Sequence, residues 1–414
     1  MIALRAWSAI ALVACSRPVE APQSVAMNAP GPVRSARAAA PAVSRPANPT
    51  PPASSAAEVA PASPAQTENL FEALRSARQW TGVAIGLIPY PRTFVSYPRW
   101  SDDVPVSVEE LSFEIVTDWR RSTPVTSAAP YPNEGWNTWN PKLDPRKHFV
   151  AVQSVVTTPE GTLWVLDTGN PKFLGVLPGA PKLVAIDLST DAVRAVIPFD
   201  ARIASGASYL NDVRFDLPRN TAYITDSGKG GLVVLDLTTK KSRRVLDDSP
   251  STHSEDTVLA IEGRPWRRLD GSNPRVHADG IALSPDREWL YYQALTGRTL
   301  YRVSTAALRD PKISRDELAG AVQVVGTPGP ADGLEATEAG ILHTSLETNA
   351  IDLVRPDGTT KTLVQDPRLA WPDSLAFGQG GDLWVTTSLI HRGRTPRERY
   401  GLWVVPGWVL REAH

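Results

Sequence analysis

The chain has 414 residues and a formal net charge of −1, with 43 Lys plus Arg residues against 44 Asp plus Glu residues. This length is too great for one ordinary domain and too small for three. No basic stripe or cluster stands out, which argues against a nucleic-acid partner. The hydrophobic share of 42% is ample for a large core.

The first fifteen residues have the composition of an export signal. A short basic segment, 1–5, precedes a mostly apolar stretch, 6–14, that is too short to span a bilayer as a helix. The stretch ends in the string LVAC, which resembles the bacterial lipobox, where the cysteine is acylated. We therefore predict a lipoprotein-type signal peptide over 1–15, with Cys15 as the lipidated residue. An ordinary secretory signal is the alternative.

Both alternatives predict an exported protein, either lipid-anchored in the bacterial envelope facing the periplasm or secreted. Cys15 is the only cysteine of the chain, so the fold must depend on its core rather than on disulfides. Residues 16–66 are rich in Ala, Pro and Ser and cannot bury enough apolar surface to offset chain entropy. We expect them to form a disordered tether.

The remaining residues, 67–414, are expected to form one all-β domain. Short strand-like runs recur at regular intervals and are separated by Gly, Pro, Asp and Asn turns. The clearest runs are 231–237, 289–292, 299–303, 382–386 and 401–405. Helical signals are sparse, and 68–78 and 304–309 are the two segments predicted to form short helices.

One short phrase repeats from residue 152 onward. In each copy a polar residue leads into an apolar stretch, a turn and a β-rich run, and the copies recur at a long, loose period. The polar residues are Gln153, Asn211, Asp279, Asp332 and Asp373. A polar residue that recurs in this way would converge on the central channel of a β-propeller. The repeat therefore predicts the location of a site as well as an architecture.

Five units begin at these residues, and a sixth, more divergent unit begins near Trp80 with 93–97 as its second strand. Each clear unit has room for four strands, so we predict a six-bladed β-propeller, whose closed ring removes exposed sheet edges. The units are too long and too uneven for a parallel β-helix. A segment between Glu68 and Gln79 is the candidate for the strand that closes the last blade.

Several strings resemble the Yellow/major royal jelly protein family in its bacterial form, which is related to L-dopachrome tautomerase. They are FVSYPRW at 94–100, LWVLDTG at 163–169, NDVRFD at 211–216, AYITDS at 222–227 and DGIALS at 279–284. The resemblance implies a six-bladed propeller, usually secreted, with a ligand pocket at one mouth of the channel. Some insect members are associated with dopachrome conversion, and others bind amines or sterols.

A more distant resemblance is to the senescence-marker-protein and gluconolactonase propellers, which are calcium-dependent lactone hydrolases. A Glu of the first blade, an Asn of a middle blade and the Asp of an Asp-Gly pair hold their metal. The last two correspond to Asn211 and Asp279 here, and a further channel Asn corresponds to Gln153. The Glu would fall near Thr81, where no carboxylate stands, so this chain departs from the pattern at the first ligand.

This second resemblance implies a Ca²⁺ site at Asn211 and Asp279, completed by Asp332 or Asp373, backbone carbonyls and water. The metal would polarise a carbonyl and activate a water molecule, with an Asp as the base. The structural alternative is that Asp-Gly pairs form turns, in which the Asp caps backbone amides and the Gly takes a positive φ. We favour a functional role for Asn211 and Asp279, with Asp279 as a catalytic candidate, and a turn role for Asp332 and Asp373. Gln153, Asn211, Asp332 and Asp373 are kept as ligand-binding candidates.

Three further candidates flank the predicted channel. His277 stands two residues before Asp279 and is the histidine expected to act in acid–base chemistry beside it, whereas the others lack paired zinc spacing. Trp136 and Trp139 lie in a loop-like insertion between the first two blades. They either stack on a ring-bearing or cationic ligand or pack the insertion onto the blades.

Three functions remain open. The first is an exported propeller that binds a small organic ligand at the channel mouth, with dopachrome-type isomerase activity if it is an enzyme. The second is a calcium-dependent lactone hydrolase, and the third is a non-catalytic propeller that binds a protein partner. The chain has neither a Gly-x-Ser-x-Gly elbow nor a Gly-rich phosphate loop, so a serine hydrolase of that type and nucleotide use are unsupported. We expect a monomer that meets the membrane only through a lipid anchor.

Overall fold

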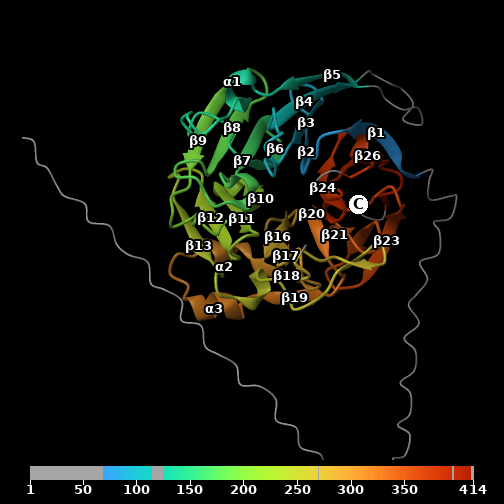
Figure 1. Cartoon of the computed structure of the whole chain (residues 1–414). Coiled ribbons are helices and arrows are strands. Elements are labelled where there is room, and N and C mark those ends of the chain that lie inside the picture. The colour runs from blue at the N-terminus through green and yellow to red at the C-terminus, as the bar shows by residue number, and fades with distance from the viewer. Residues whose placement is uncertain (1–68, 114–124, 269, 394–395, 412–414) are drawn as a thin grey trace, which may run out of the picture. The chain divides into compact units, whose positions relative to one another are not determined.

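The computed structural model describes residues 69–113, 125–268, 270–393 and 396–411. The predicted signal peptide with Cys15 and the predicted tether lie outside these residues. Among the described helices, none has the length and apolar character needed to cross a membrane. The domain consists of six four-stranded antiparallel sheets that follow one another around an axis (Figure 1). The predicted all-β, six-bladed propeller is therefore confirmed.

The first three blades each take four consecutive strands from the chain. Blade 1 consists of β2 (Gly82–Gly86), β3 (Arg92–Ser96), β4 (Val108–Phe113) and β5 (Val125–Pro130). Blade 2 consists of β6 (Val152–Thr158), β7 (Thr162–Asp167), β8 (Lys182–Asp187) and β9 (Val193–Pro198). Blade 3 consists of β10 (Leu210–Asp216), β11 (Thr221–Asp226), β12 (Leu232–Asp236) and β13 (Ser242–Val245).

The next two blades follow the same order. Blade 4 consists of β16 (Ala278–Leu283), β17 (Trp289–Ala294), β18 (Leu300–Ser304) and β19 (Gln323–Gly326). Blade 5 consists of β20 (Ala331–Thr337), β21 (Gly340–Ser345), β22 (Ala350–Val354) and β23 (Thr360–Gln365). An insertion between blades 3 and 4 carries a small hairpin of β14 (Ala260–Ile261) and β15 (Arg264–Pro265). Short helices occupy connections as α1 (Glu134–Asn137), α2 (Thr305–Arg309) and α3 (Arg315–Gly320).

The sixth blade closes the ring with a strand from the start of the domain. It consists of β24 (Pro372–Phe377), β25 (Leu383–Thr387) and β26 (Tyr400–Val405), with β1 (Phe71–Ser76) paired antiparallel to β26 at the outer edge. The helix predicted over 68–78 is wrong, because pairing with β26 outweighs the weak helical preference of so short a segment. The predicted closing role of this segment is confirmed, and the helix predicted over 304–309 is present as α2.

A β-bulge interrupts the innermost strand of five blades at the point where the repeated phrase begins. In β10, Leu210 pairs with Asp226 and Val213 pairs with Ile224, so the two residues between have no partner in the ladder. The same shift occurs in β6, β16, β20 and β24, whereas β2 of blade 1 pairs with β3 without a shift. Because bulges re-aim neighbouring side chains, the repeated phrase is the sequence of this bulge, and it fades where the bulge is missing.

A threonine of the second strand accepts from a backbone amide that the bulge leaves free in three blades. The contacts run from Asp212 to Thr225, from Asp332 to Thr344 and from Ser374 to Thr386, at 3.2, 3.1 and 3.0 Å between nitrogen and Oγ1. A buried amide without an acceptor would cost about 1–3 kcal/mol. These threonines therefore fix the bulges in place.

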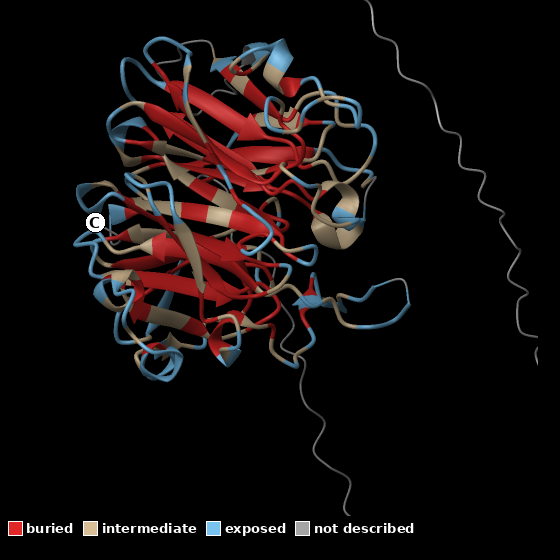
Figure 2. Cartoon of the chain, turned by 90° about the vertical axis from the view of Figure 1, so that its left-hand side faces the viewer, coloured by how far each residue is buried: buried red, intermediate tan, exposed pale blue. Residues whose placement is uncertain are grey.

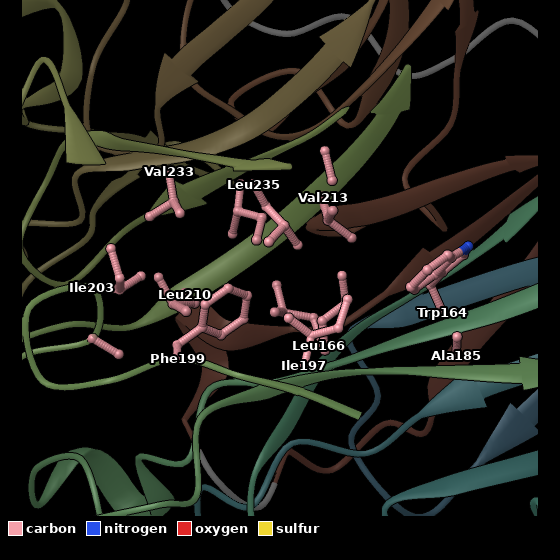
Figure 3. Close-up of a cluster of buried hydrophobic side chains, with 14 residues drawn as sticks. Trp164, Leu166, Ala185, Ile197, Phe199, Ile203, Leu210, Val213, Val233 and Leu235 are labelled. Atoms are coloured by element: carbon pink, nitrogen blue, oxygen red, sulfur yellow. The ribbon is translucent and has the colours of Figure 1, made fainter. Parts of the chain in front are cut away.

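Apolar side chains fill the space between neighbouring blades and hold the innermost strands in register. Figure 3 shows one such cluster, in which Trp164 and Leu166 of blade 2 face Val213 and Val233 of blade 3. The ring of Trp164 also stacks on Phe215, with centroids 4.6 Å apart. Most buried residues lie in the inner strands of the blades, whereas exposed residues lie in the connecting loops and in outer strands such as β19 and β23 (Figure 2). The axis of the propeller is thus surrounded by a rigid frame.

A substitution of Leu70, which directly precedes β1, tests whether this strand stabilises the closed ring of blades. It is 1% exposed and packs in a core cluster with Trp403 and Leu410. Replacing Leu70 by Ala should lower the free energy of unfolding by about 2–5 kcal/mol, measured by urea denaturation. Glu72→Ala in the same strand removes only a surface ion pair with Arg75 and should cost less than about 1 kcal/mol. Equal losses in the two variants would contradict this stabilising role.

Candidate functional site

The five predicted channel residues meet at the axis of the propeller. Each occupies the second position of an innermost strand, and together with a residue that precedes β2 they line one cavity of about 20 Å³. The members of this set, the axial ring, are Thr81, Gln153, Asn211, Asp279, Asp332 and Asp373. Because every member comes from a different blade, the axial ring exists only when the six sheets have closed.

Hydrogen bonds connect members of the axial ring. Asn211 donates from its side-chain amide to the carboxyl group of Asp279, which in turn shares a hydrogen bond with the carboxyl group of Asp332. Thr81 donates its hydroxyl to the backbone carbonyl of Gln153 at 2.9 Å. Two carboxyl groups can share a hydrogen bond only when one of them is protonated. A hydrogen bond between Asp279 and Asp332 therefore requires a proton on one of them, which agrees with the raised pKa of both carboxyls.

Burial raises the pKa of all three ring carboxyls. Desolvation is the largest cause for each, and repulsion from neighbouring carboxyls, including Asp212, adds to it. The pKa values of Asp279 and Asp373 lie well above the usual range. The pKa of Asp332 rises only to about 6, because the indole N–H of Trp371 donates to its Oδ2 at 2.7 Å and favours the charged form. The ring thus keeps protons at a pH where exposed carboxyls have lost them.

Asp373 offers an unused acceptor to the axial cavity. Its Oδ2 atom is buried and has no hydrogen-bond partner among the residues that the structure describes. The residue as a whole is 4% exposed. A buried polar atom without a partner is costly and uncommon in natural folds. Burial raises the pKa of this carboxyl, and the nearby side chains of Ser388 and Ser374 lower it by a smaller amount.

The glycines of the two Asp-Gly pairs allow close packing and do not form turns. The turn alternative, with a positive φ at the glycine, does not apply to them, because neither Gly280 nor Gly333 has one. A Cβ atom at Gly280 would lie 2.5 Å from the carbonyl oxygen of Asp332, and one at Gly333 would lie 2.1 Å from that of Asp373. At such distances any side chain larger than hydrogen would clash with the next blade. The two glycines therefore allow the bulges of neighbouring blades to approach closely, which brings the Asp side chains of these bulges together.

Three aromatic side chains border the axial ring on the side of blades 2 and 3. Tyr209 donates its hydroxyl to Gln153 Oε1 at 2.8 Å and accepts from Trp100 Nε1 at 2.7 Å. Phe173 packs on both rings, with its centroid 4.9 Å from that of Tyr209 and 5.7 Å from that of Trp100, yet it is 56% exposed. We call Trp100, Phe173 and Tyr209 the aromatic shelf. It offers an apolar surface next to the ring.

His277 lies beside the axial ring but does not line its cavity. Its Nδ1 accepts from the backbone amide of Ser254 at 3.0 Å, and its ring packs edge-on against that of His253. Burial lowers the pKa of His277, and the charges of His253 and Arg275 lower it further. The imidazole is therefore held neutral, with Nδ1 used as an acceptor.

Trp136 and Trp139 belong to the segment before blade 2 and lie away from the axial cavity. Trp136, in α1, packs on Phe149 with ring centroids 5.1 Å apart and borders the core cluster between blades 1 and 2. Trp139 is half-buried beyond the end of the same helix. These contacts correspond to the packing alternative for Trp136, and a role of either residue in ligand binding stays a prediction.

The axial ring does not have the arrangement expected of a calcium site. Asn211 presents its side-chain nitrogen, and not its oxygen, to Asp279. Thr81 supplies a hydroxyl that is already bonded to Gln153, at the position where the resemblance places a Glu. Across the described residues, no group of three His, Cys, Asp or Glu side chains is arranged to hold a metal ion. We therefore derive no catalytic step through calcium.

Two further cavities lie outside the axial cavity. One of about 200 Å³ shares residues with the axial cavity and is lined by Arg214, which donates to the backbone carbonyl of Leu334 at 2.8 Å. The other, of about 1020 Å³, is an open groove lined by residues of blades 2 and 3 such as Phe199 and Lys240. The groove has the largest volume of these three cavities. Only in the axial cavity, however, do buried carboxyl groups from several blades converge. The axial ring is therefore the candidate site.

Tyr209 and Trp371 are site residues that the sequence analysis does not identify. A signal for them is nevertheless present in the chain. A ring with a polar tip stands two residues before the axial residue in blades 3, 4 and 6, as Tyr209, His277 and Trp371. The pattern is visible only once the repeat is aligned on the bulge, because no single motif marks these rings.

A family model described as major royal jelly protein matches residues 150–392. Major royal jelly protein 6 of Apis mellifera is 26% identical over 220 residues, which are 51% of this chain and 46% of that protein. Protein yellow of Drosophila melanogaster is 26% identical over 238 residues, 54% of this chain and 41% of that protein. The match thus spans less than half the length of these relatives. The resemblance predicted from the sequence is confirmed.

Two solved structures are similar to this chain over most of its length. A luciferin-regenerating enzyme covers 82% of this chain and 95% of its own, with 14% identity and a TM-score of 0.48. A gluconolactonase from Xanthomonas campestris covers 81% of this chain and 89% of its own, also with 14% identity and a TM-score of 0.48. Similarity at this level carries no argument about ligand or reaction.

The raised pKa values predict how the stability of the fold changes with pH. A carboxyl whose pKa is higher in the folded state stabilises the fold below its unfolded pKa and loses that contribution as pH rises through its folded pKa. For Asp332 this window runs from about pH 4 to about pH 6. Asp332→Asn, which keeps an acceptor for Trp371, should therefore gain about 1–3 kcal/mol of unfolding free energy between pH 4 and pH 8 relative to wild type.

Urea denaturation at pH 4, 6 and 8 measures this difference. The matched control is Asp286→Asn in a surface turn, where a hydrogen bond from Ser284 lowers the carboxyl pKa. It should show no gain at high pH, because its charged form is the favoured one. A parallel loss of stability in Asp332→Asn at all three pH values would contradict the prediction.

Proposed function

Because the chain belongs to the major royal jelly protein family, we propose that it binds a small organic molecule at the mouth of its propeller channel. The observation that carries the proposal is the convergence of Asp279, Asp332 and Asp373 on one small cavity at the axis. The unpartnered oxygen of Asp373 gives a ligand a specific atom to bind. Ligand sites combine a few convergent polar groups with apolar walls, and the axial ring and the aromatic shelf supply both.

The chemistry of the ring favours a protonated amine as the polar group of the ligand. All four titratable residues that line the axial cavity are acids, namely Asp212, Asp279, Asp332 and Asp373, and no described lining residue is a base. A cation would stabilise the charged form of carboxyls whose pKa burial has raised. A cavity of about 20 Å³ accommodates about one non-hydrogen atom, such as an ammonium nitrogen. The organic body of the ligand must then lie above the ring.

The aromatic shelf is suited to that organic body. Phe173 is exposed although its ring packs on Trp100 and Tyr209, so one apolar face is free to contact a ligand. Tyr209 also bonds to Gln153 of the axial ring, which fixes the shelf directly beside the carboxyls. A flat aromatic amine could therefore place its nitrogen in the ring and its body on Phe173.

Dopachrome-type isomerisation is the reaction that we propose for these groups if the ligand is a substrate. Such an isomerisation removes a proton from a C–H bond, adds a proton at another atom of the molecule and changes no net oxidation state. It needs acid–base groups near the operating pH and no redox cofactor. The proton-sharing pair of Asp279 and Asp332 fits this need, since one oxygen can take a proton while another returns one. His277 is not required for this step.

Calorimetry with 2-phenylethylamine and its neutral analogue 2-phenylethanol tests the proposal. The wild type should bind the amine and not the alcohol. The affinity should rise between pH 5 and pH 8, by up to about tenfold per pH unit for each proton that the ring releases. Asp373→Asn should weaken amine binding at least about tenfold, because it removes a charge next to the ammonium group.

The surface variant Asp286→Asn is the matched control and should bind the amine as the wild type does. Equal affinity for the amine and the alcohol, or an affinity that falls as pH rises, would count against an ammonium ligand. Calcium chloride is the second titrant. Binding of calcium without binding of the amine would replace this proposal by the calcium-dependent lactone hydrolase.

We also propose that the protein is exported and held at the membrane by a lipid on Cys15, on the strength of the LVAC string alone. In a bacterial host, the wild type should incorporate labelled palmitate and sediment with membranes. Cys15→Ala should lose the label and leave the membrane fraction. A Cys15→Ala protein that still sediments with membranes would refute the anchor, and an unlabelled wild type would leave the secretory alternative.

A further inference from the structure

Trp371 is a buried residue of the channel mouth whose conformation the proposed function does not explain. It is 0% exposed and has a φ of 55°. A bulky side chain in this left-handed region is an outlier, and such outliers persist only where the surroundings fix the residue. Trp371 lies between β23 and β24, two residues before Asp373.

On one side, Trp371 contacts the axial ring of the preceding blade. Its Nε1 donates to Asp332 Oδ2 at 2.7 Å. The other groups that face Asp332 are all carboxyls, namely Asp279 by a hydrogen bond and Asp212 and Asp373 by charge. The indole N–H of Trp371 is thus a neutral donor that stabilises the charged form of Asp332, whereas the charges of neighbouring carboxyls destabilise that form.

On its other side, Trp371 contacts the insertion between blades 3 and 4. Trp266 packs edge-on against it, with ring centroids 4.8 Å apart at 74°. His391 of the β25–β26 connection stacks parallel to it at 5.6 Å and 8°. His391 Nε2 lies 2.8 Å from Oε2 of Glu262 in the insertion. Trp371 is therefore held between the insertion and the sixth blade.

A small apolar core surrounds these contacts. Leu259 and Ile261 of the insertion pack with Leu295, Leu346 and Trp371, which come from three other connections. This cluster is separate from the cores between the blades. The insertion is consequently fixed over the ends of blades 4, 5 and 6, with Trp371 at the point where the cluster meets the axial ring.

Blade 3 contains an equivalent contact. Tyr209 also stands two residues before an axial residue, and its hydroxyl donates to Gln153 of the preceding blade at 2.8 Å. The two rings thus occupy the same position in the repeat and bond to the same kind of target. Because the same kind of contact occurs in two blades, the hydrogen bond between Trp371 and Asp332 is a regular feature of the site.

We infer that Trp371 is a positioning residue, which holds the carboxyl group of Asp332 toward the axis and connects the axial ring to the insertion. The inference rests on the proposed function, because it takes Asp332 as part of the ligand site. Its consequence is that insertion residues without contact to the ligand, such as Trp266, influence both the ionisation of Asp332 and the binding of an amine.

Trp371→Phe removes the N–H donor and keeps an aromatic ring in the cluster. The pH midpoint of the ring carboxyls, followed by the pH dependence of the unfolding free energy without ligand, should move upward by about one pH unit, because charged Asp332 loses its donor. Affinity for 2-phenylethylamine should fall about tenfold at pH 6.5 and recover by pH 8. A merely structural role would lower stability equally at every pH and leave the midpoint unchanged.

Trp408→Phe, at a residue that is 48% exposed, is the matched control and should change neither quantity. Trp266→Leu removes the edge contact without touching the ring, so it decides the question if Trp371→Phe does not fold, and its midpoint should move upward by a smaller amount. An unmoved midpoint in the variants that fold would overturn the inference. The pH midpoint is measured without ligand. A wild type that binds no amine would therefore refute the proposed function, and the midpoints of the variants would still test the role of Trp371.

Discussion

The site of this protein depends on the β-bulge at the start of its innermost strands. In an uninterrupted strand, alternate side chains would enter the cores on the two sides of the blade. The bulge releases one or two residues from the ladder and turns Gln153, Asn211 and the ring aspartates toward the axis. Threonines of the second strands satisfy the released amides in three blades, so the distortion is stable.

This geometry brings like charges together in a buried place. Hydrogen bonds offset part of that cost, because Asn211 donates to Asp279 and Trp371 donates to Asp332. The raised pKa values show that the charged forms of the ring carboxyls are still destabilised by burial and mutual repulsion. Functional sites often lower the stability of the unliganded protein. A bound cation would remove the electrostatic cost of the buried carboxyl groups in this site.

Part of this could be predicted from the sequence because the repeat carries it. The period predicted six units, and the polar residues of the five bulges are five of the six members of the axial ring. The helix predicted over 68–78 failed because a short segment has little preference of its own, and pairing with β26 decides its conformation. A turn was the structural alternative for the glycines of the Asp-Gly pairs, but these glycines instead allow the next blade to approach closely.

The sequence by itself determined the blade count, the identity of the axial residues and the absence of a Glu at Thr81, because these follow from local pattern and residue type. Only the tertiary structure decided which side chains bond to them. Tyr209 and Trp371 reach residues of the preceding blade, and the insertion meets Trp371 across three connections. Such contacts join residues far apart in the chain, and ring closure alone brings them within hydrogen-bonding distance.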